Sequence, residues 1–187
     1  MVYYQKNHKH AQGIVHKGVS RVHTTVFDTG TQKLVIGRDG WEIIKRHDNF
    51  IDTQGVNMGG PPKTRRRFQL VYARVVVKNC LDGKRYLVIL RQALFNPNLD
   101  ETLLAEDQIE CCGVKVYSRP KLFCGKQLVE ATDQVGRSVK LVMYWDGSTI
   151  YLNVSHPTRC DVERLGYLQL TCGEPYSTYI PFRSTTI

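Results

Sequence analysis

The residues best suited to chemistry in this 187-residue chain form the tripeptide Asp28-Thr29-Gly30, followed by Thr31. The tripeptide comes directly after a predicted strand, so the Asp28 carboxylate would leave the strand at a tight loop and point into a cleft. Gly30 has no Cβ and allows a close backbone approach, which lets its N–H bond the carboxylate, while Thr29 adds a hydroxyl that can brace the loop. Such a carboxylate can activate water for attack on a carbonyl if a second carboxylate shares its proton.

The segments around this tripeptide are predicted to be strands. Residues 19–27 are rich in β-branched side chains and alternate in part, as a strand with one covered face does. The apolar residues 34–36 would anchor the loop that follows. Apolar residues in 68–77 and 86–90, on either side of Asp82-Gly83, predict a hairpin with a two-residue turn.

Further along the chain, two more hairpins and one helix are predicted. One hairpin turns at Asp146-Gly147 and the other lies around Asp133–Gly136. The helix is expected to be capped by Asp100 and terminated by Gly113. Its buried face would consist of a set of residues at helical spacing, namely Leu104, Gln108, Ile109 and Cys112.

One short helix among many strands predicts an all-β fold, a small closed barrel with a β-hairpin-rich C-terminal extension. The chain divides into a polar leader over residues 1–18, a compact β domain over 19–120, and the extension and tail over 121–187. A length of 187 residues favours one domain, or one domain with an appendage, and a chain of this length buries enough surface to fold without disulfides or a structural metal.

Composition excludes several classes of protein. No apolar run approaches the ~18 residues of a membrane span, and the polar, His-rich start is not a secretory signal. The six cysteines are too sparse for a disulfide scaffold, and neither they nor the histidines have the spacing of a zinc site. We therefore expect reduced thiols, an intracellular and cytoplasmic setting, no membrane partner, no cofactor and no metal.

Three segments, taken in chain order, resemble the retropepsin family of aspartic proteases, and specifically the protease region of copia-type retrotransposon polyproteins. The first is Phe27–Thr31 with Val35-Ile36-Gly37, the second is Gln92–Pro97, and the third runs from Glu101-Thr102-Leu103-Leu104 to Gln108-Ile109. The resemblance covers residues 19–120. It implies a retropepsin-like barrel, with Asp28 as the catalytic aspartate, Thr29 bracing two active-site loops, and Gly30 and Thr31 completing the loop.

The resemblance also implies a flap and a homodimer. The glycine-rich segment 55–62 would form the tip of a hairpin flap over the substrate, with Gly59 and Gly60 near the tip. In this family each subunit supplies one aspartate, and the chain has no second Asp-Thr-Gly or Asp-Ser-Gly. The implied function is a homodimeric aspartic endopeptidase that hydrolyses a retroelement polyprotein with carboxylate-activated water.

Two other functions stay open. Residues 1–93 contain 17 basic and six acidic side chains, and such a basic half can hold a polyanion. A nucleic-acid-binding module would use basic side chains with aromatic side chains that stack on bases; the candidates are residues 63–67, Lys45, Arg46 and Lys78, with Phe68 or Tyr72. Alternatively, the barrel is a catalytically silent assembly module of the same polyprotein.

Overall fold

The computed structural model describes residues 22–28, 31, 33–38, 40–54, 65–119 and 127–172. Of these described residues, strands make up 55% and helices 9%, so the predicted all-β class is confirmed. The predicted leader, residues 1–18, lies outside the described residues, as do Thr29, Gly30, Gly59 and Gly60.

Six strands form a closed barrel. Following the hydrogen bonds around the ring, the strands are β1 (Val22–Phe27), β6 (Thr102–Leu104), β2 (Val35–Ile36), β5 (Arg85–Phe95), β4 (Arg65–Lys78) and β11 (Ile150–Ser155). The ring closes because β11 pairs with β1 over its whole length and also with β4, through Val154 and Ser155. The predicted small closed barrel is therefore confirmed.

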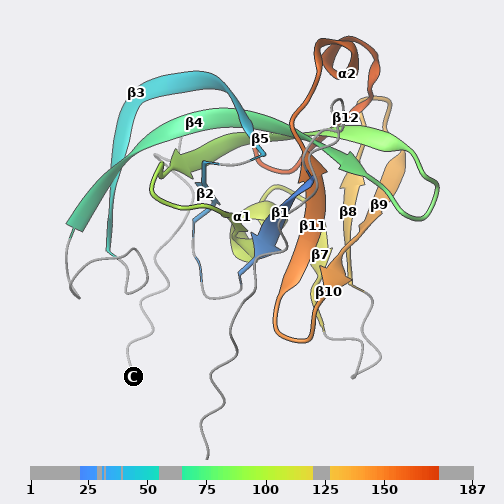
Figure 1. The fold of residues 1–187 in the computed structure, drawn as a ribbon, viewed down its shortest axis with the longest axis horizontal. Coiled ribbons are helices and arrows are strands. Elements are labelled where there is room, and N and C mark those ends of the chain that lie inside the picture. The colour runs from blue at the N-terminus through green and yellow to red at the C-terminus, as the bar shows by residue number, and fades with distance from the viewer. Residues whose placement is uncertain are drawn as a thin grey trace, which may run out of the picture.

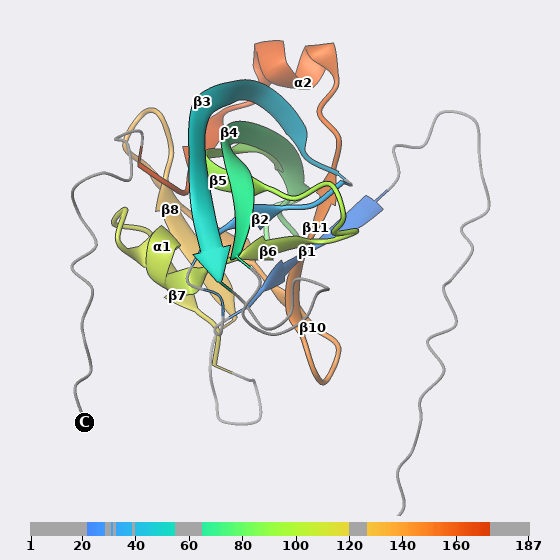
Figure 2. The ribbon, with the colours of Figure 1, turned by 90° about the vertical axis from the view of Figure 1, so that its left-hand side faces the viewer.

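Three more strands extend the barrel sheet among the described residues. β3 (Glu42–Gln54) pairs with β4, β10 (Tyr144–Trp145) pairs with β11, and β12 (Tyr167–Gln169) runs parallel to β5. In Figure 1, β3 and β4 form a long curved hairpin that arches over the other strands, and Figure 2 shows this hairpin from the side where β3 ends and β4 begins. This is the hairpin for which a flap is predicted, and its tip, residues 55–64, lies outside the described residues.

A second sheet shares the core of the barrel. It consists of β7 (Lys115–Tyr117), β8 (Leu128–Thr132) and β9 (Ser138–Val142) in the order 7-8-9. Apolar side chains of this sheet, such as Val129 and Leu141, belong to the same buried cluster as Phe27 and Leu104 of the barrel. Residues 121–187, predicted as an extension, thus contribute three strands of the barrel sheet, β10, β11 and β12, and most of the sheet that covers it.

The three predicted hairpins are all present, but one turn differs. β10 and β11 flank Asp146-Gly147, and β8 and β9 flank Asp133–Gly136. The last paired residues of β4 and β5 are Lys78 and Arg85, and Asn79 N–H still donates to the Lys84 carbonyl. The predicted two-residue turn at Asp82-Gly83 is therefore wrong, because four residues connect that last hydrogen-bonded pair.

The predicted helix is shorter than expected. Residues 102–104 form β6, and α1 comprises only Glu106–Glu110, with Ala105 at its N-cap and no side-chain cap. Asp100 does not cap it, because its carboxylate forms an ion pair with Arg38. Gly113 follows the helix with a left-handed φ of 79°, as predicted for a terminator.

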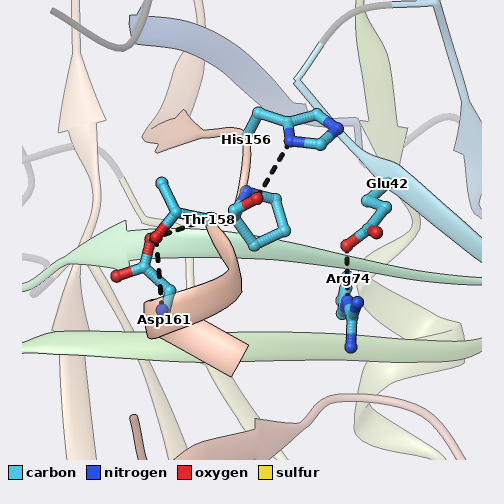
Figure 3. A network of polar contacts seen from close by, with 6 residues as sticks. Glu42, Arg74, His156, Thr158 and Asp161 are labelled. Atoms are coloured by element: carbon cyan, nitrogen blue, oxygen red, sulfur yellow. Dashed lines mark hydrogen bonds and ion pairs between the residues drawn. The ribbon is translucent and has the colours of Figure 1, made fainter. Parts of the chain in front are cut away.

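The prediction of a single helix is wrong, because α2 forms over Arg159–Arg164. Thr158 and Asp161 cap each other: the Asp161 carboxylate accepts from the Thr158 N–H, and the Thr158 hydroxyl accepts from the Asp161 N–H. Figure 3 shows these two residues together. Burial alone would raise the pKa of Asp161, but the bonds from Thr158 and the charge of Arg85 lower it.

Candidate active site

Asp28 directly follows β1, which is one of the six strands that form the barrel ring. β1 is flanked by β11 on one side and by the parallel strand β6 on the other. The Asp28 N–H donates to the Leu104 carbonyl with an N···O distance of 3.0 Å, which continues the ladder one residue beyond Phe27. The Asp28 side chain is half-buried, so a paired, central strand holds a carboxylate that solvent can still reach.

Thr31 closes a tight turn onto Asp28. The Thr31 N–H donates to the Asp28 carbonyl at 3.3 Å, and the Thr31 hydroxyl donates to Oδ2 of the Asp28 carboxylate at 2.8 Å. Of the four residues of the predicted active-site loop, the structure thus brings Asp28 and Thr31 into direct contact. The predicted roles of Thr29 and Gly30 concern residues outside those described.

Asp28 is on the face of the sheet that the long hairpin covers. Phe27 and Leu104 point into the main core, and Val26 pairs with Leu103. Leu103 packs against a second, smaller apolar cluster. Because successive side chains of a strand alternate between faces, Asp28 lies on the same face as Val26 and Leu103.

The second cluster lies between β2, the end of β5 and the long hairpin. Its buried members are Val35, Phe68, Leu70 and Leu94, and its partly buried members are Ile51, Leu99 and Leu103. The buried members pack against one another, so only the partly buried members keep apolar surface on the face of Asp28. The cluster also uses Phe68, which is 7% exposed, so little of its ring is open for stacking on a base.

Gln108 of α1 fixes the segment that leaves the Asp28 loop. Its side-chain carbonyl accepts from the Leu34 N–H at 2.9 Å, and its NH₂ group donates to the Gln92 carbonyl at 2.6 Å. Gln108 is 6% exposed, so both bonds are shielded from water. The helical pattern predicts that Gln108 faces the core, but the two long-range hydrogen bonds were not predicted.

Two further contacts tie β1 and β6 to the segment around β2. The Gly37 N–H donates to the buried Thr102 hydroxyl at 3.1 Å, and a Cβ at Gly37 would overlap the backbone carbonyls of Leu99 and Glu101. The Trp41 indole N–H donates to the Thr25 hydroxyl at 2.9 Å. Glycine is therefore required at position 37 for close backbone approach, and Trp41 has a structural role in holding β1.

Burial lowers the pKa of the Lys33 ammonium, two positions after Thr31, and a second partly buried charged group is Glu106 at the start of α1. Burial raises the pKa of Glu106, and the hydrogen bond from the Ser118 hydroxyl opposes this rise. Among the described residues, no three His, Cys, Asp or Glu side chains gather closely enough to bind a metal ion.

A second feature of the long hairpin is a set of arginines stacked on aromatic rings. The Arg46 guanidinium lies 4.6 Å from the Phe95 ring centre, and that of Arg67 lies 5.0 Å from the Phe50 ring centre. An open hollow of about 590 Å³ lies beside them, lined by Phe50, Arg67, Phe68, Gln69, Phe95, Asn96, Pro97 and Asn98. Alternation in the sequence did not reveal that Phe50 is exposed (47%) or that Arg46 and Phe95 meet.

The two aromatic candidates for base stacking differ from each other in the structure. Phe68 is in the second cluster, whereas Tyr72 is half-buried, with its ring 4.3 Å from His47 in an edge contact and 5.8 Å from the Lys45 ammonium. The basic side chains of this part of the chain therefore lie beside the aromatic rings of Phe50, Phe95 and Tyr72.

Comparison with protein-family models, curated proteins and solved structures finds no significant match for this chain. None of the helices among the described residues is both long and apolar enough to cross a membrane.

Proposed function

We propose that the chain is an aspartic endopeptidase of a retroelement polyprotein that acts as a homodimer, with Asp28 of each subunit in one catalytic pair. The observation that carries this proposal is the position of Asp28, whose half-buried carboxylate immediately follows a central barrel strand and accepts a hydrogen bond from Thr31.

Three features of the surroundings support the same function. The chain contains one Asp-Thr-Gly, so a second copy must supply the other carboxylate. The partly buried members of the second cluster, Ile51, Leu99 and Leu103, lie on the face of Asp28, where they could contact the side chains of an extended peptide. The β3–β4 hairpin is long enough to cover that face, which suits the flap predicted around Gly59 and Gly60.

The proposed reaction follows from two like charges in contact. Two Asp28 carboxylates about 3 Å apart cannot both ionise, so the pair shares one proton. The charged carboxylate takes a proton from water as the water oxygen attacks the peptide carbonyl, and the protonated one donates to the carbonyl oxygen. The carboxyl group that took the proton from water then gives it to the leaving nitrogen as the C–N bond breaks. No covalent acyl-enzyme forms. Thr31 holds one oxygen of the pair in place.

This proposal predicts cleavage with an acidic, bell-shaped pH profile, because one carboxyl group must be charged and the other protonated. The measurement is incubation of the purified chain with a peptide library over a range of pH values, with and without a pepstatin-type inhibitor. We expect cleavage between pH ~4 and 6 that the inhibitor abolishes. A flat or alkaline profile, or cleavage that the inhibitor leaves unchanged, would contradict the proposal.

A second candidate function, contact with a nucleic acid, is favoured by the arginines at the hollow. A guanidinium stacked on a ring keeps its charge and its outward N–H donors, and the exposed Phe50 ring could stack on a base. Arg46 is also held by a hydrogen bond to the Gln69 side chain at 3.2 Å. Such a contact could accompany proteolysis, since the hollow uses none of the residues that hold Asp28.

The Arg46→Gln/Arg67→Gln double variant tests this candidate. If both guanidinium groups contact phosphates, the slope of log affinity against log salt for a labelled single-stranded RNA becomes smaller by roughly 1.4, and peptide cleavage is unchanged. The control is Arg137→Gln/Arg159→Gln, which removes the same charge from exposed side chains elsewhere. Equal slopes for the two double variants would exclude the hollow as a nucleic-acid site.

A further inference from the structure

Two cysteines that are 60 positions apart in the sequence meet in the fold. The Cys172 N–H donates to Sγ of Cys112, with an N···S distance of 2.7 Å. The two thiol side chains are also within hydrogen-bonding reach of each other. Both are free thiols, and neither belongs to the site around Asp28.

The chain segments that carry the two cysteines are also held in place by other hydrogen bonds. Cys112 comes just after α1, and its N–H donates to the Ile109 carbonyl at 3.0 Å. On the other side, the Leu170 N–H donates to the Ile89 carbonyl at 3.0 Å, and the Thr171 hydroxyl accepts from the Arg91 N–H at 2.7 Å. The two cysteines therefore lie on anchored segments, and the contact of the Cys172 N–H with Sγ of Cys112 brings them close together, as a disulfide requires.

We propose that Cys112 and Cys172 are a redox site that forms a reversible disulfide with a small-molecule disulfide such as oxidised glutathione as the oxidant. The thiolate of Cys172, which is exposed, attacks one glutathione sulfur and releases one glutathione thiolate. Cys112 then loses its proton and attacks Sγ of Cys172, which releases the second glutathione. Two protein thiols are oxidised, and one glutathione disulfide is reduced to two glutathione thiols.

The surroundings of the two thiols assign their order in this exchange. Burial raises the pKa of Cys112 to about 12, with a further rise from the Cys172 side chain, so Cys112 stays protonated at neutral pH and is a poor first nucleophile. It instead resolves the mixed disulfide on Cys172. Since this second step needs the Cys112 thiolate, ring closure becomes faster as the pH rises toward 9.

The disulfide would join the end of α1 to the segment after β12. It closes a loop of 60 residues, which removes conformational entropy from the unfolded chain. We expect the oxidised chain to melt roughly 5–10 °C higher than the reduced chain. This inference does not depend on the proposed proteolysis, because its readouts are covalent pairing and melting temperature.

The test is oxidation of the full chain with glutathione disulfide, followed by non-reducing peptide mapping by mass spectrometry and by thermal melting. We expect a cross-linked peptide pair containing Cys112 and Cys172, and a rise in melting temperature that dithiothreitol reverses. Cys112→Ser and Cys172→Ser should each abolish the cross-link and the rise.

Cys111→Ser is the matched control, because it removes an exposed thiol next to Cys112 and should leave both readouts unchanged. The proposal is wrong if Cys112 pairs mainly with Cys111 or Cys124, or if both thiols stay reduced under conditions that oxidise Cys80 or Cys160. It is also wrong if Cys172 stops at the glutathione adduct at pH 9.

Discussion

Replacing Asp28 with Asn is expected to lower peptide cleavage at least about 10³-fold while the barrel and the dimer remain. In the homodimer this one substitution removes both carboxylates of the proposed pair, so no group is left to take a proton from water. Asn has nearly the same shape as Asp and keeps an oxygen that can accept from the Thr31 hydroxyl. The measurements are kcat/KM on a cleaved peptide, thermal melting and the oligomeric state by analytical ultracentrifugation.

The matched control for Asp28→Asn is Asp48→Asn, which makes the same chemical change at an exposed position of β3. It should leave kcat/KM within about twofold, because surface changes away from the site have small effects. Cleavage that survives Asp28→Asn would mean that another group or a contaminating protease performs it. Loss of the dimer in Asp28→Asn would instead assign a structural role to the carboxylate.

The same experiment separates proteolysis from the catalytically silent assembly module. A silent module would form dimers in the wild type and in Asp28→Asn alike, and neither would cleave any peptide of the library at any pH. The two functions therefore give opposite results for the wild type, and the variant then shows whether cleavage, where present, depends on Asp28.

Local sequence patterns were enough to predict most strands and the position of the carboxylate. Alternation identifies β4 and β5, and the Asp-Gly pair at 146–147 identifies the hairpin of β10 and β11, because these signals depend on residues close in the chain. Asp28 directly follows β1 because apolar, β-branched residues stop at Phe27. The pairing of β1 with β6 and β11 depends on residues 77 and 123 to 133 positions away.

Features that depend on distant partners were mispredicted or missed. Leu103 and Leu104 fit a helical pattern, but pairing with β1 and β2 makes them a strand, so tertiary contacts outweigh local preference. The helix α2 did have a local signal, since Thr158 and Asp161 have the spacing of a capping box. The hydrogen bonds of Gln108 have no such signal, because their partners lie 74 and 16 positions away.

Replacing Gln108 with Leu is expected to destabilise the fold by roughly 2–4 kcal/mol, the largest effect on stability that we predict. Leu has a similar size and suits the core, so the change mainly removes hydrogen bonds. It leaves the Leu34 N–H and the Gln92 carbonyl buried without their partner, and each unmet group costs about 1–3 kcal/mol. The measurement is the free energy of unfolding in urea, with the m-value checked for two-state behaviour.

Gln134→Leu provides the matched control, because the Gln134 side chain also accepts from a backbone N–H, that of Tyr167, at 2.9 Å. Gln134 is exposed, so water can replace the lost bond, and we expect a change below about 0.5 kcal/mol. Equal losses for the two variants would mean that burial does not strengthen the Gln108 contacts.

Since Leu34 leads out of the Asp28–Thr31 turn, folded Gln108→Leu protein should also cleave peptide more slowly, by roughly tenfold or more. Unchanged kcat/KM in the folded variant would show that Thr31 and β6 hold Asp28 without help from α1.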